Sequence, residues 1–125
     1  MPYIMSLDQG TSSSRAAIYS LDGQVIAVAQ HMLDLLHPAD GWVEQDPEAI
    51  WQTTLKAGRE VIGQAAIDPA DIACIGITNQ RETSLMWDRE SSACVYNAIV
   101  WQDRRTADSC EHYKRLGLES MIQEK

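Results

Sequence analysis

The first quarter of the chain alternates short apolar runs with compact polar turns, a pattern typical of an antiparallel sheet. We predict strands over Tyr3–Leu7, Arg15–Ser20 and Gln24–Ala29. Asp22-Gly23 lies between the second and third runs and is a strong hairpin signal, because the turn requires a positive φ that glycine adopts without steric cost. The pattern therefore predicts a three-stranded antiparallel meander.

A long helix is predicted to begin at Asp46-Pro47. Asp46 suits an N-cap, and Pro47 suits the first helical position, where its missing N–H costs nothing. From there apolar residues recur at spacings of four and three and form one helix face. The residues of this face are Trp51, Leu55, Gly58, Ile62 and Ala65. We expect this face to pack against the sheet.

The second half of the chain opens with a continuous apolar run, Ile72–Thr78. Such a run predicts a strand covered on both faces and paired in parallel, with Cys74 as a small core residue. A crossover through the preceding helix would bring this strand beside the first one. Ser84–Asp88 and Asn97–Trp101 predict two more strands, and Arg105–Leu116 carries helical periodicity. The predicted class is α/β with a mixed sheet.

The predicted sheet is incompletely covered. Four strands and one firm crossover helix leave one face and one edge open, and an open parallel edge normally needs a neighbour. The last residues, Met121–Lys125, read as part of an amphipathic helix with no strand after them. We therefore expect the chain to be part of a larger protein.

Composition narrows the function classes. The chain has 125 residues, 45% of them hydrophobic, and a net charge of −8. This acidic balance argues against nucleic acid or an anionic membrane as a partner. No run reaches the ~20 apolar residues that span a bilayer, and the N-terminus lacks the pattern of an export signal. The three cysteines form no disulfide framework or zinc motif, so we expect a reduced, cytoplasmic protein.

The turn after the first strand carries the first candidate site. Its sequence is Asp8-Gln9-Gly10-Thr11-Ser12-Ser13-Ser14-Arg15. Glycine lets backbone N–H groups approach phosphate oxygens, the hydroxyls add donors, and the arginine adds charge-assisted bonds. The carboxylate suits Mg²⁺ held through water. The alternative is a serine-rich hairpin loop that binds nothing.

The second candidate site is the polar segment Asn79–Thr83 at the C-terminal end of the predicted parallel strand. Ligands gather at such strand ends in open α/β sheets. Glu82 can accept two O–H bonds from vicinal hydroxyls while Arg81 donates to their oxygens. The alternative is a surface turn whose charges pair with each other or face water.

Trp101 is a third candidate because it ends a predicted strand beside the polar run Gln102–Arg105. Its indole face can pack on the C–H edge of a polyol while the polar neighbours hold the hydroxyls. The alternative is ordinary core packing, since aromatic rings dominate protein cores. The adjacent arginines Arg104 and Arg105 are interpreted as residues of a helix start or of salt bridges. The three histidines are scattered and suggest neither a metal site nor a base.

Together these segments resemble the N-terminal region of the FGGY family of carbohydrate kinases. The resemblance is carried in order by Leu7–Arg15, Gly41–Pro47, Gly76–Thr83 and Tyr96–Arg105, which cover nearly the whole chain. Each motif alone is modest, but their combination is specific. Two departures are small: Ser12 stands where Thr is common, and Gln45 stands where His is common.

The resemblance implies a ribonuclease-H-like, actin-like ATPase domain. Residues 1–125 would form the N-terminal part of the first of two domains, without the second, nucleotide-side domain. Within the family, Asn79–Thr83 favours glycerol over sugars, so the implied reaction converts ATP and glycerol to ADP and sn-glycerol 3-phosphate. The parent protein is expected to be a cytoplasmic homo-oligomer that uses ATP and Mg²⁺.

The resemblance also implies a role for each matching site residue. Nucleotide phosphates would contact Thr11, Ser12, Ser13 and Arg15, with Thr11 also meeting the phosphorylated product. Glycerol would be held by Arg81 and Glu82, with Trp101 against its carbon backbone, and Asp8 would lie near the magnesium ion.

The family's general base and adenine-binding domain lie downstream of the matching region, so no catalytic base is assigned in this chain. Phosphoryl transfer depends on positioning and on water exclusion, and we expect the 125-residue chain alone to be inactive. Two other functions remain open. One is an FGGY kinase acting on a pentulose or gluconate, and the other is a non-catalytic, actin-like nucleotide-binding module.

Overall fold

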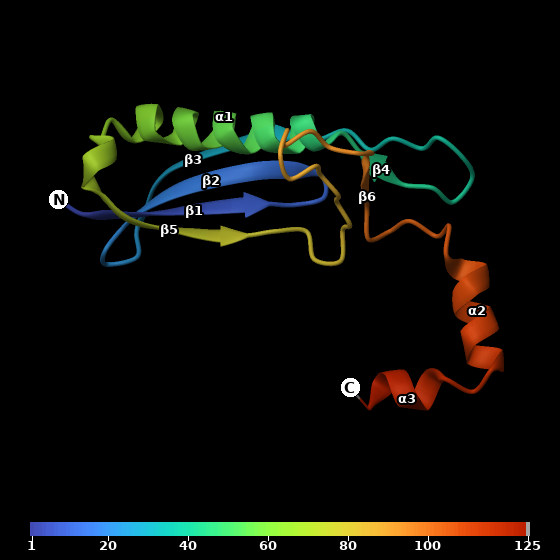
Figure 1. The fold of residues 1–125 in the computed structure, drawn as a ribbon. Coiled ribbons are helices and arrows are strands. Elements are labelled where there is room, and N and C mark those ends of the chain that lie inside the picture. The colour runs from blue at the N-terminus through green and yellow to red at the C-terminus, as the bar shows by residue number, and fades with distance from the viewer. Residues whose placement is uncertain (125) are drawn as a thin grey trace.

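A four-stranded mixed sheet, with strand order β3-β2-β1-β5, forms the body of the protein (Figure 1). The computed structural model describes residues 1–124. The sheet strands are β1 (Tyr3–Gln9), β2 (Ser13–Ser20), β3 (Val25–Met32) and β5 (Ile72–Thr78). The other elements are α1 (Pro47–Ala65), a 3₁₀ turn (Pro69–Asp71), β4 (Glu44–Gln45), β6 (Ala98–Ile99), α2 (Ala107–Arg115) and α3 (Glu119–Gln123). The predicted α/β class is confirmed.

The predicted meander is confirmed, because β1 pairs antiparallel with β2 and β2 pairs antiparallel with β3. Gly23 adopts φ +85° in the turn, and its N–H donates to the carbonyl of Ser20 at 3.0 Å. The parallel pairing of β5 with β1 is also confirmed, with Asp8 opposite Thr78 at the C-terminal end of both strands. Both strands therefore deliver their following loops to the same edge of the sheet.

Helix α1 covers one face of the sheet (Figure 1). Asp46 caps it as predicted, accepting a hydrogen bond from the backbone N–H of Glu48 at 2.9 Å. Its fully buried residues are Ala57 and Val61, which pack into a core of small and medium side chains from β1, β2 and β3. The predicted face packs on the sheet only in part: Ile62 and Ala65 contact this core, whereas Trp51 is 57% exposed. The buried contacts of α1 with the sheet are made by Ala57 and Val61. Trp51 and Leu55, at the start of the predicted face, lie at the edge of this core, toward β5.

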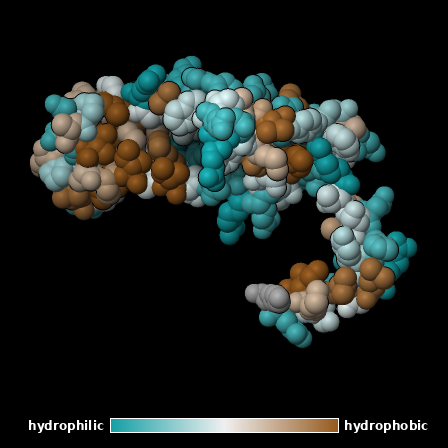
Figure 2. Space-filling view, viewed as in Figure 1, coloured by the Kyte–Doolittle hydropathy of each residue, from teal (hydrophilic) through white to brown (hydrophobic). Residues whose placement is uncertain are grey.

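Strand β5 is less covered than predicted. Ile75 is 53% exposed and Ile77 is 74% exposed, and Cys74 is an exposed thiol rather than a core residue. Because α1 lies over β1, β2 and β3, the stripe on its flank and β5 leave between them an apolar groove of about 420 Å³. Hydrophobic surface gathers on this side of the molecule (Figure 2). The expectation of an undercovered edge is thus met among the described residues.

The two strands predicted at 84–88 and 97–101 are largely replaced by a loose antiparallel hairpin. Isolated bridges join Ser84 to Ile99 and Trp87 to Cys94, and only the two residues of β6 form a strand, paired with β4. Helix α2 is shorter than predicted, although the chain does turn at Gly117, with φ +75°.

Helices α2 and α3 form an arm that leaves the body of the molecule (Figure 1). The expected amphipathic helix at Met121–Lys125 corresponds to α3, which spans Glu119–Gln123, while Lys125 lies outside the described residues. Within residues 1–124, no helix combines the length and the apolar character needed to cross a bilayer.

Candidate active site

The loops that follow β1 and β5 meet at one rim of the sheet. The side-chain amide of Gln80, just after β5, donates to Oε1 of Gln9 at the end of β1 over 3.3 Å. It also donates to Oε1 of Gln45 in β4 over 2.7 Å. The two candidate segments therefore share one side of the molecule, as the analysis of strand ends predicted.

The turn between β1 and β2 is tight and rich in hydroxyls. The N–H of Gly10 donates to the carbonyl of Ser13 at 2.9 Å, and a Cβ at position 10 would lie 3.2 Å from that oxygen, so the turn favours glycine. Thr11, Ser12 and Ser13 are partly or fully exposed, whereas Ser14 is fully buried. The turn thus leaves the residues that carry hydroxyls at positions 11 to 13 at least partly exposed.

The hydroxyl of Ser14 has a structural role. It hydrogen-bonds Oγ1 of Thr53 at 2.9 Å and accepts from Oγ1 of Thr54 at 3.2 Å, both on α1. These bonds connect the beginning of β2 to α1 and so hold the adjoining turn in place.

Asp8 and Arg15 lie opposite each other on β1 and β2. Arg15 Nη2 donates to Asp8 Oδ2 at 3.0 Å, and both side chains are substantially exposed. Among residues 1–124 no group of three or more His, Cys, Asp or Glu side chains is arranged to hold a metal ion. One carboxylate beside a hydroxyl-rich turn nevertheless fits Mg²⁺, which keeps several waters and is completed by substrate phosphates.

Glu82 and Trp101 line the same cavity, of about 270 Å³. Glu82 adopts φ +67°, a conformation that is uncommon for a residue other than glycine and that concentrates at functional sites. Arg81 precedes it in the same exposed turn. The cavity thus collects one candidate hydroxyl acceptor and one candidate apolar platform.

Trp101 is 52% exposed, so it is not a core residue. Its indole Nε1–H donates to Oγ1 of Thr11 at 2.9 Å, and its backbone N–H donates to Oγ1 of Thr83 at 3.3 Å. This pair of bonds joins the rim of the cavity to the hydroxyl-rich turn.

A largely buried ion cluster contributes Asp103 and Arg105 to the lining of the same cavity. Arg105 donates to Glu44 at 2.7 Å and to Asp103 at 2.8 Å, and it stacks 3.9 Å over the ring of Trp42. Asp103 also accepts from the backbone N–H of Val43 at 2.7 Å. The salt-bridge interpretation of Arg105 is therefore confirmed, and the expectation that the run after Trp101 holds substrate hydroxyls stays a prediction.

The cluster shifts the pKa values of its members in opposite directions. Hydrogen bonds from Arg105 and Asn97 hold the pKa of Glu44 below its ordinary value. Hydrogen bonds from Arg105 hold the pKa of Asp103 well below its usual range, and the carboxylates raise the pKa of Arg105 in return. Glu44 also raises the pKa of Tyr96, whose hydroxyl donates to it at 2.8 Å. Glu44, Asp103 and Arg105 therefore stay ionised at neutral pH, and Tyr96 stays neutral.

Sequence reasoning missed two buried amides, Gln45 and Gln80. Gln45 is fully buried and Gln80 is 7% exposed. Both lie in motifs that carried the family resemblance, but an amide offers no local signal for its partners. The one clue was position: Gln80 lies between β5 and the turn that holds Arg81 and Glu82, and Gln45 directly precedes the N-cap of α1.

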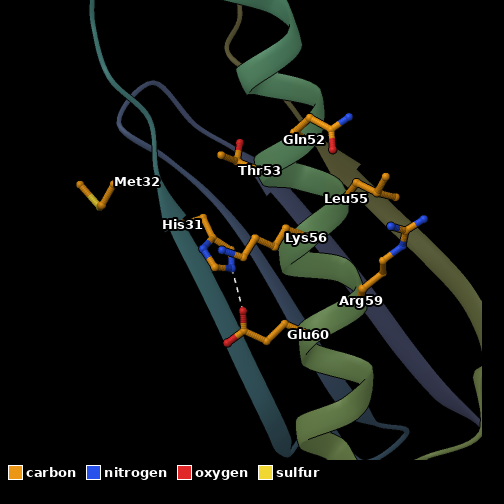
Figure 3. Close-up of a pocket in the computed structure, with 8 residues that line it drawn as sticks. All are labelled: His31, Met32, Gln52, Thr53, Leu55, Lys56, Arg59 and Glu60. Atoms are coloured by element: carbon orange, nitrogen blue, oxygen red, sulfur yellow. Dashed lines mark hydrogen bonds and ion pairs between the residues drawn. The ribbon is translucent and has the colours of Figure 1, made fainter.

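A larger concavity, of about 730 Å³, lies elsewhere, between β3 and α1 (Figure 3). His31 Nε2 lies 2.7 Å from Glu60 Oε2, and Lys56 extends toward the same side of the helix, whereas Arg59 points to the opposite side. An exposed pair of this kind contributes little stability. None of the candidate site residues lines this concavity, so we assign the site to the rim of the sheet.

Residues 3–125 match the N-terminal domain of the FGGY family of carbohydrate kinases, and the chain belongs to this family. Two of its curated relatives are bacterial glycerol kinases. That of Burkholderia cenocepacia is 49% identical over 98% of this chain, and that of Variovorax paradoxus is 48% identical over 100% of it. The chain spans about a quarter of the length of these curated relatives.

Solved structures of carbohydrate kinases share the fold of this chain. Plasmodium falciparum glycerol kinase with ADP matches with a TM-score of 0.83 and 33% identity, over 90% of this chain and 23% of that one. Xylulose kinase from Lactobacillus acidophilus matches with a TM-score of 0.86 over 100% of this chain and 25% of that one. At 24% identity, that second likeness shows the fold alone. The implied actin-like ATPase fold is thereby confirmed.

Proposed function

We propose that the protein carrying this chain transfers the terminal phosphoryl group of ATP to glycerol, giving ADP and sn-glycerol 3-phosphate. The observation that carries the proposal is the 2.9 Å hydrogen bond from Trp101 Nε1 to Thr11 Oγ1. It joins the polyol side of the rim to the phosphate side, and phosphoryl transfer requires these two sides to be in contact. The 49% identity to glycerol kinases supports glycerol as the acceptor.

On the nucleotide side, Thr11, Ser12 and Ser13 would donate hydroxyl and backbone hydrogen bonds to phosphate oxygens. Arg15 would add a charge-assisted bond, which is about twice as strong as a neutral one. Asp8 would hold Mg²⁺ through water, and the ion would neutralise charge on the phosphates. These residues orient the phosphoryl group and stabilise the charge that develops on it.

On the acceptor side, Glu82 would accept hydrogen bonds from two glycerol hydroxyls while Arg81 donates to their oxygens. Trp101 would cover the carbon backbone and exclude water from one face. The group that takes the proton from the attacking hydroxyl is proposed to lie in the rest of the protein. The chain would thus be the N-terminal part of the first of two domains, and alone it would not turn over ATP.

We further propose that the parent protein is a cytoplasmic homo-oligomer with no nucleic-acid partner. The net charge of −8 argues against a nucleic-acid partner. The exposed thiols of Cys74, Cys94 and Cys110 suit a reducing compartment such as the cytoplasm. Light scattering on the complete gene product measures the oligomeric state.

The test compares acceptors in the complete gene product. We expect turnover of ATP with glycerol to exceed that with xylulose or gluconate. Glu82→Gln is expected to raise KM for glycerol by about 10- to 150-fold, since it removes a charged hydrogen-bond acceptor. Glu90→Gln, an exposed change in the neighbouring hairpin, is the matched control. Preference for a sugar acid or pentulose, or nucleotide binding without phosphoryl transfer, would contradict the proposal.

A further inference from the structure

Five side chains at the rim close a ring of hydrogen bonds. Gln45 Nε2 donates to the carbonyl of Thr11 at 2.6 Å, and Gln80 Nε2 donates to Gln45 Oε1 at 2.7 Å. Thr83 Oγ1 donates to Gln80 Oε1 at 3.0 Å and accepts from the backbone N–H of Trp101 at 3.3 Å. The indole of Trp101 returns to Thr11 Oγ1 at 2.9 Å.

The ring has a fixed direction. Gln80 uses its amide N–H toward Gln45 and its carbonyl toward Thr83, so each half of the side chain has a separate task. Gln45 likewise accepts on one side and donates on the other. Because both amides are buried, a lost partner leaves a polar group unsatisfied rather than hydrated. Reversing the Gln45 amide would break two bonds of the ring, because the carbonyl of Thr11 can only accept and the Gln80 N–H can only donate.

We propose that Gln80 is a positioning residue that couples the phosphate-binding turn to the polyol cavity. Gln80 is 7% exposed and is not among the residues that line the cavity of Glu82 and Trp101. It holds Thr11 through Gln45 and Trp101 through Thr83, and so fixes the distance between the two sides. This inference rests on the function proposed above and assigns the group that couples the two subsites.

The coupling follows from the geometry of Trp101. With half its surface exposed, the residue is held at the rim at two points: its backbone N–H donates to Thr83, and its indole N–H donates to Thr11. A ligand that orders Thr11 therefore orders the polyol platform as well. By linkage, a polyol that orders Trp101 strengthens nucleotide binding by the same factor.

The test uses the complete gene product with Gln80→Leu, Gln80→Glu and Thr83→Val. Gln80→Leu removes both tasks of the amide at similar volume. Gln80→Glu keeps the acceptor toward Thr83 but places a carboxylate against Gln45 Oε1. If Gln45 turned over to donate to it, the Gln45 oxygen would face the carbonyl of Thr11. Gln64→Leu is the matched control, because Gln64 is exposed and bonds only to Glu60 within α1.

We expect both Gln80 variants to lower kcat/KM for glycerol by about 10- to 100-fold, the loss that follows from misplacing a site by about 1 Å. The affinity gain that ATP gives glycerol should shrink in the same variants. The ¹H–¹⁵N indole signal of Trp101, assigned by loss of the signal in Trp101→Phe, should shift and exchange faster with solvent. Gln64→Leu should change none of these.

Gln45→His is a conservative variant that can keep both hydrogen bonds of Gln45 in the ring. A neutral imidazole keeps one donor and one acceptor, but a protonated one only donates and cannot accept from Gln80. We expect kcat/KM of this variant to approach that of the unmodified protein above about pH 6.5 and to fall below that pH. The unmodified protein should show no such step.

Unchanged coupling and an unchanged Trp101 signal in Gln80→Leu would overturn the inference. If that variant does not fold, Gln80→Glu decides in the same way, because it keeps the acceptor toward Thr83 and removes the donor toward Gln45. Thr83→Val removes both the donor to Gln80 and the acceptor for the Trp101 backbone N–H, so it shows what losing that whole side of the ring does. Lack of glycerol phosphorylation by the unmodified protein would overturn the proposed function instead. The Trp101 signal reports on the ring in either case.

Discussion

Gly58 in the middle of α1 offers a direct test of how closely the helix approaches the sheet. A Cβ at this position would lie 3.6 Å from Leu7 Cδ2, which is an ordinary van der Waals contact, and Gly58 does not adopt a positive φ. Gly58→Ala should therefore stabilise the protein, because glycine in a helix interior costs about 1 kcal/mol relative to alanine. Partial burial of the new methyl group adds at most ~0.8 kcal/mol.

The expected gain is about 1–1.5 kcal/mol, which corresponds to a rise in Tm of about 3–6 °C for a chain of this size. The assay is thermal and urea unfolding of the 125-residue chain, followed by far-UV circular dichroism. Gly63→Ala is the matched variant, since a Cβ there would meet nothing within 4 Å. It should gain the helix-propensity part alone.

The difference between the two variants measures the packing of α1 on β1. If Gly63→Ala stabilised the chain while Gly58→Ala destabilised it, Leu7 would have to lie closer to the helix than the structure has it. The placement of α1 over the end of β1, and hence the support of the phosphate-binding turn, would then be wrong.

Three further predictions concern the site. The pKa of Glu44 is depressed in the folded state, so its contribution to stability is present above about pH 4.3 and is lost as the pH falls through the lower folded value. Urea midpoints at pH 7, 5 and 3 should therefore fall less in Glu44→Gln, which has lost the ionisable partner of Arg105; equal slopes would contradict this. Arg15→Gln should change stability by less than about 1 kcal/mol, because its pair with Asp8 is exposed, yet weaken ATP binding about 10- to 150-fold by calorimetry. Trp101→Phe removes the N–H donor to Thr11 but keeps the apolar face, so KM for glycerol should rise about 2- to 12-fold, and an unchanged KM would contradict a role for that hydrogen bond.

The local elements were the predictable part of the fold. The meander follows from contiguous runs and the Gly23 turn, and the start of α1 follows from Asp46 and Pro47. The coverage of β5 was not predictable, because a continuous apolar run looks the same whether its neighbours belong to this chain or not. Trp51 was misplaced for a related reason: spacing defines a stripe on a helix but not which part of the stripe reaches the core.

The candidate site divides in the same way. The hydroxyl-rich turn, the Arg81-Glu82 pair and Trp101 were singled out by residue type and by their place at strand ends. The pairing of Glu44 with Arg105 was not, since the two are separated by 61 positions and nothing in the intervening sequence indicates the contact. Amides such as Gln80 are harder still, because they both donate and accept and so suit almost any neighbour.

The strand order β3-β2-β1-β5 also has a kinetic consequence. The three meander strands are contiguous and close through short loops, whereas Tyr3 and Ile72 pair across about 70 residues of chain. Long loops close late, because their entropy is lost before the distant contacts form. During folding, the chain would therefore form its phosphate-binding turn first. The polyol pocket would form only after β5 had paired with β1.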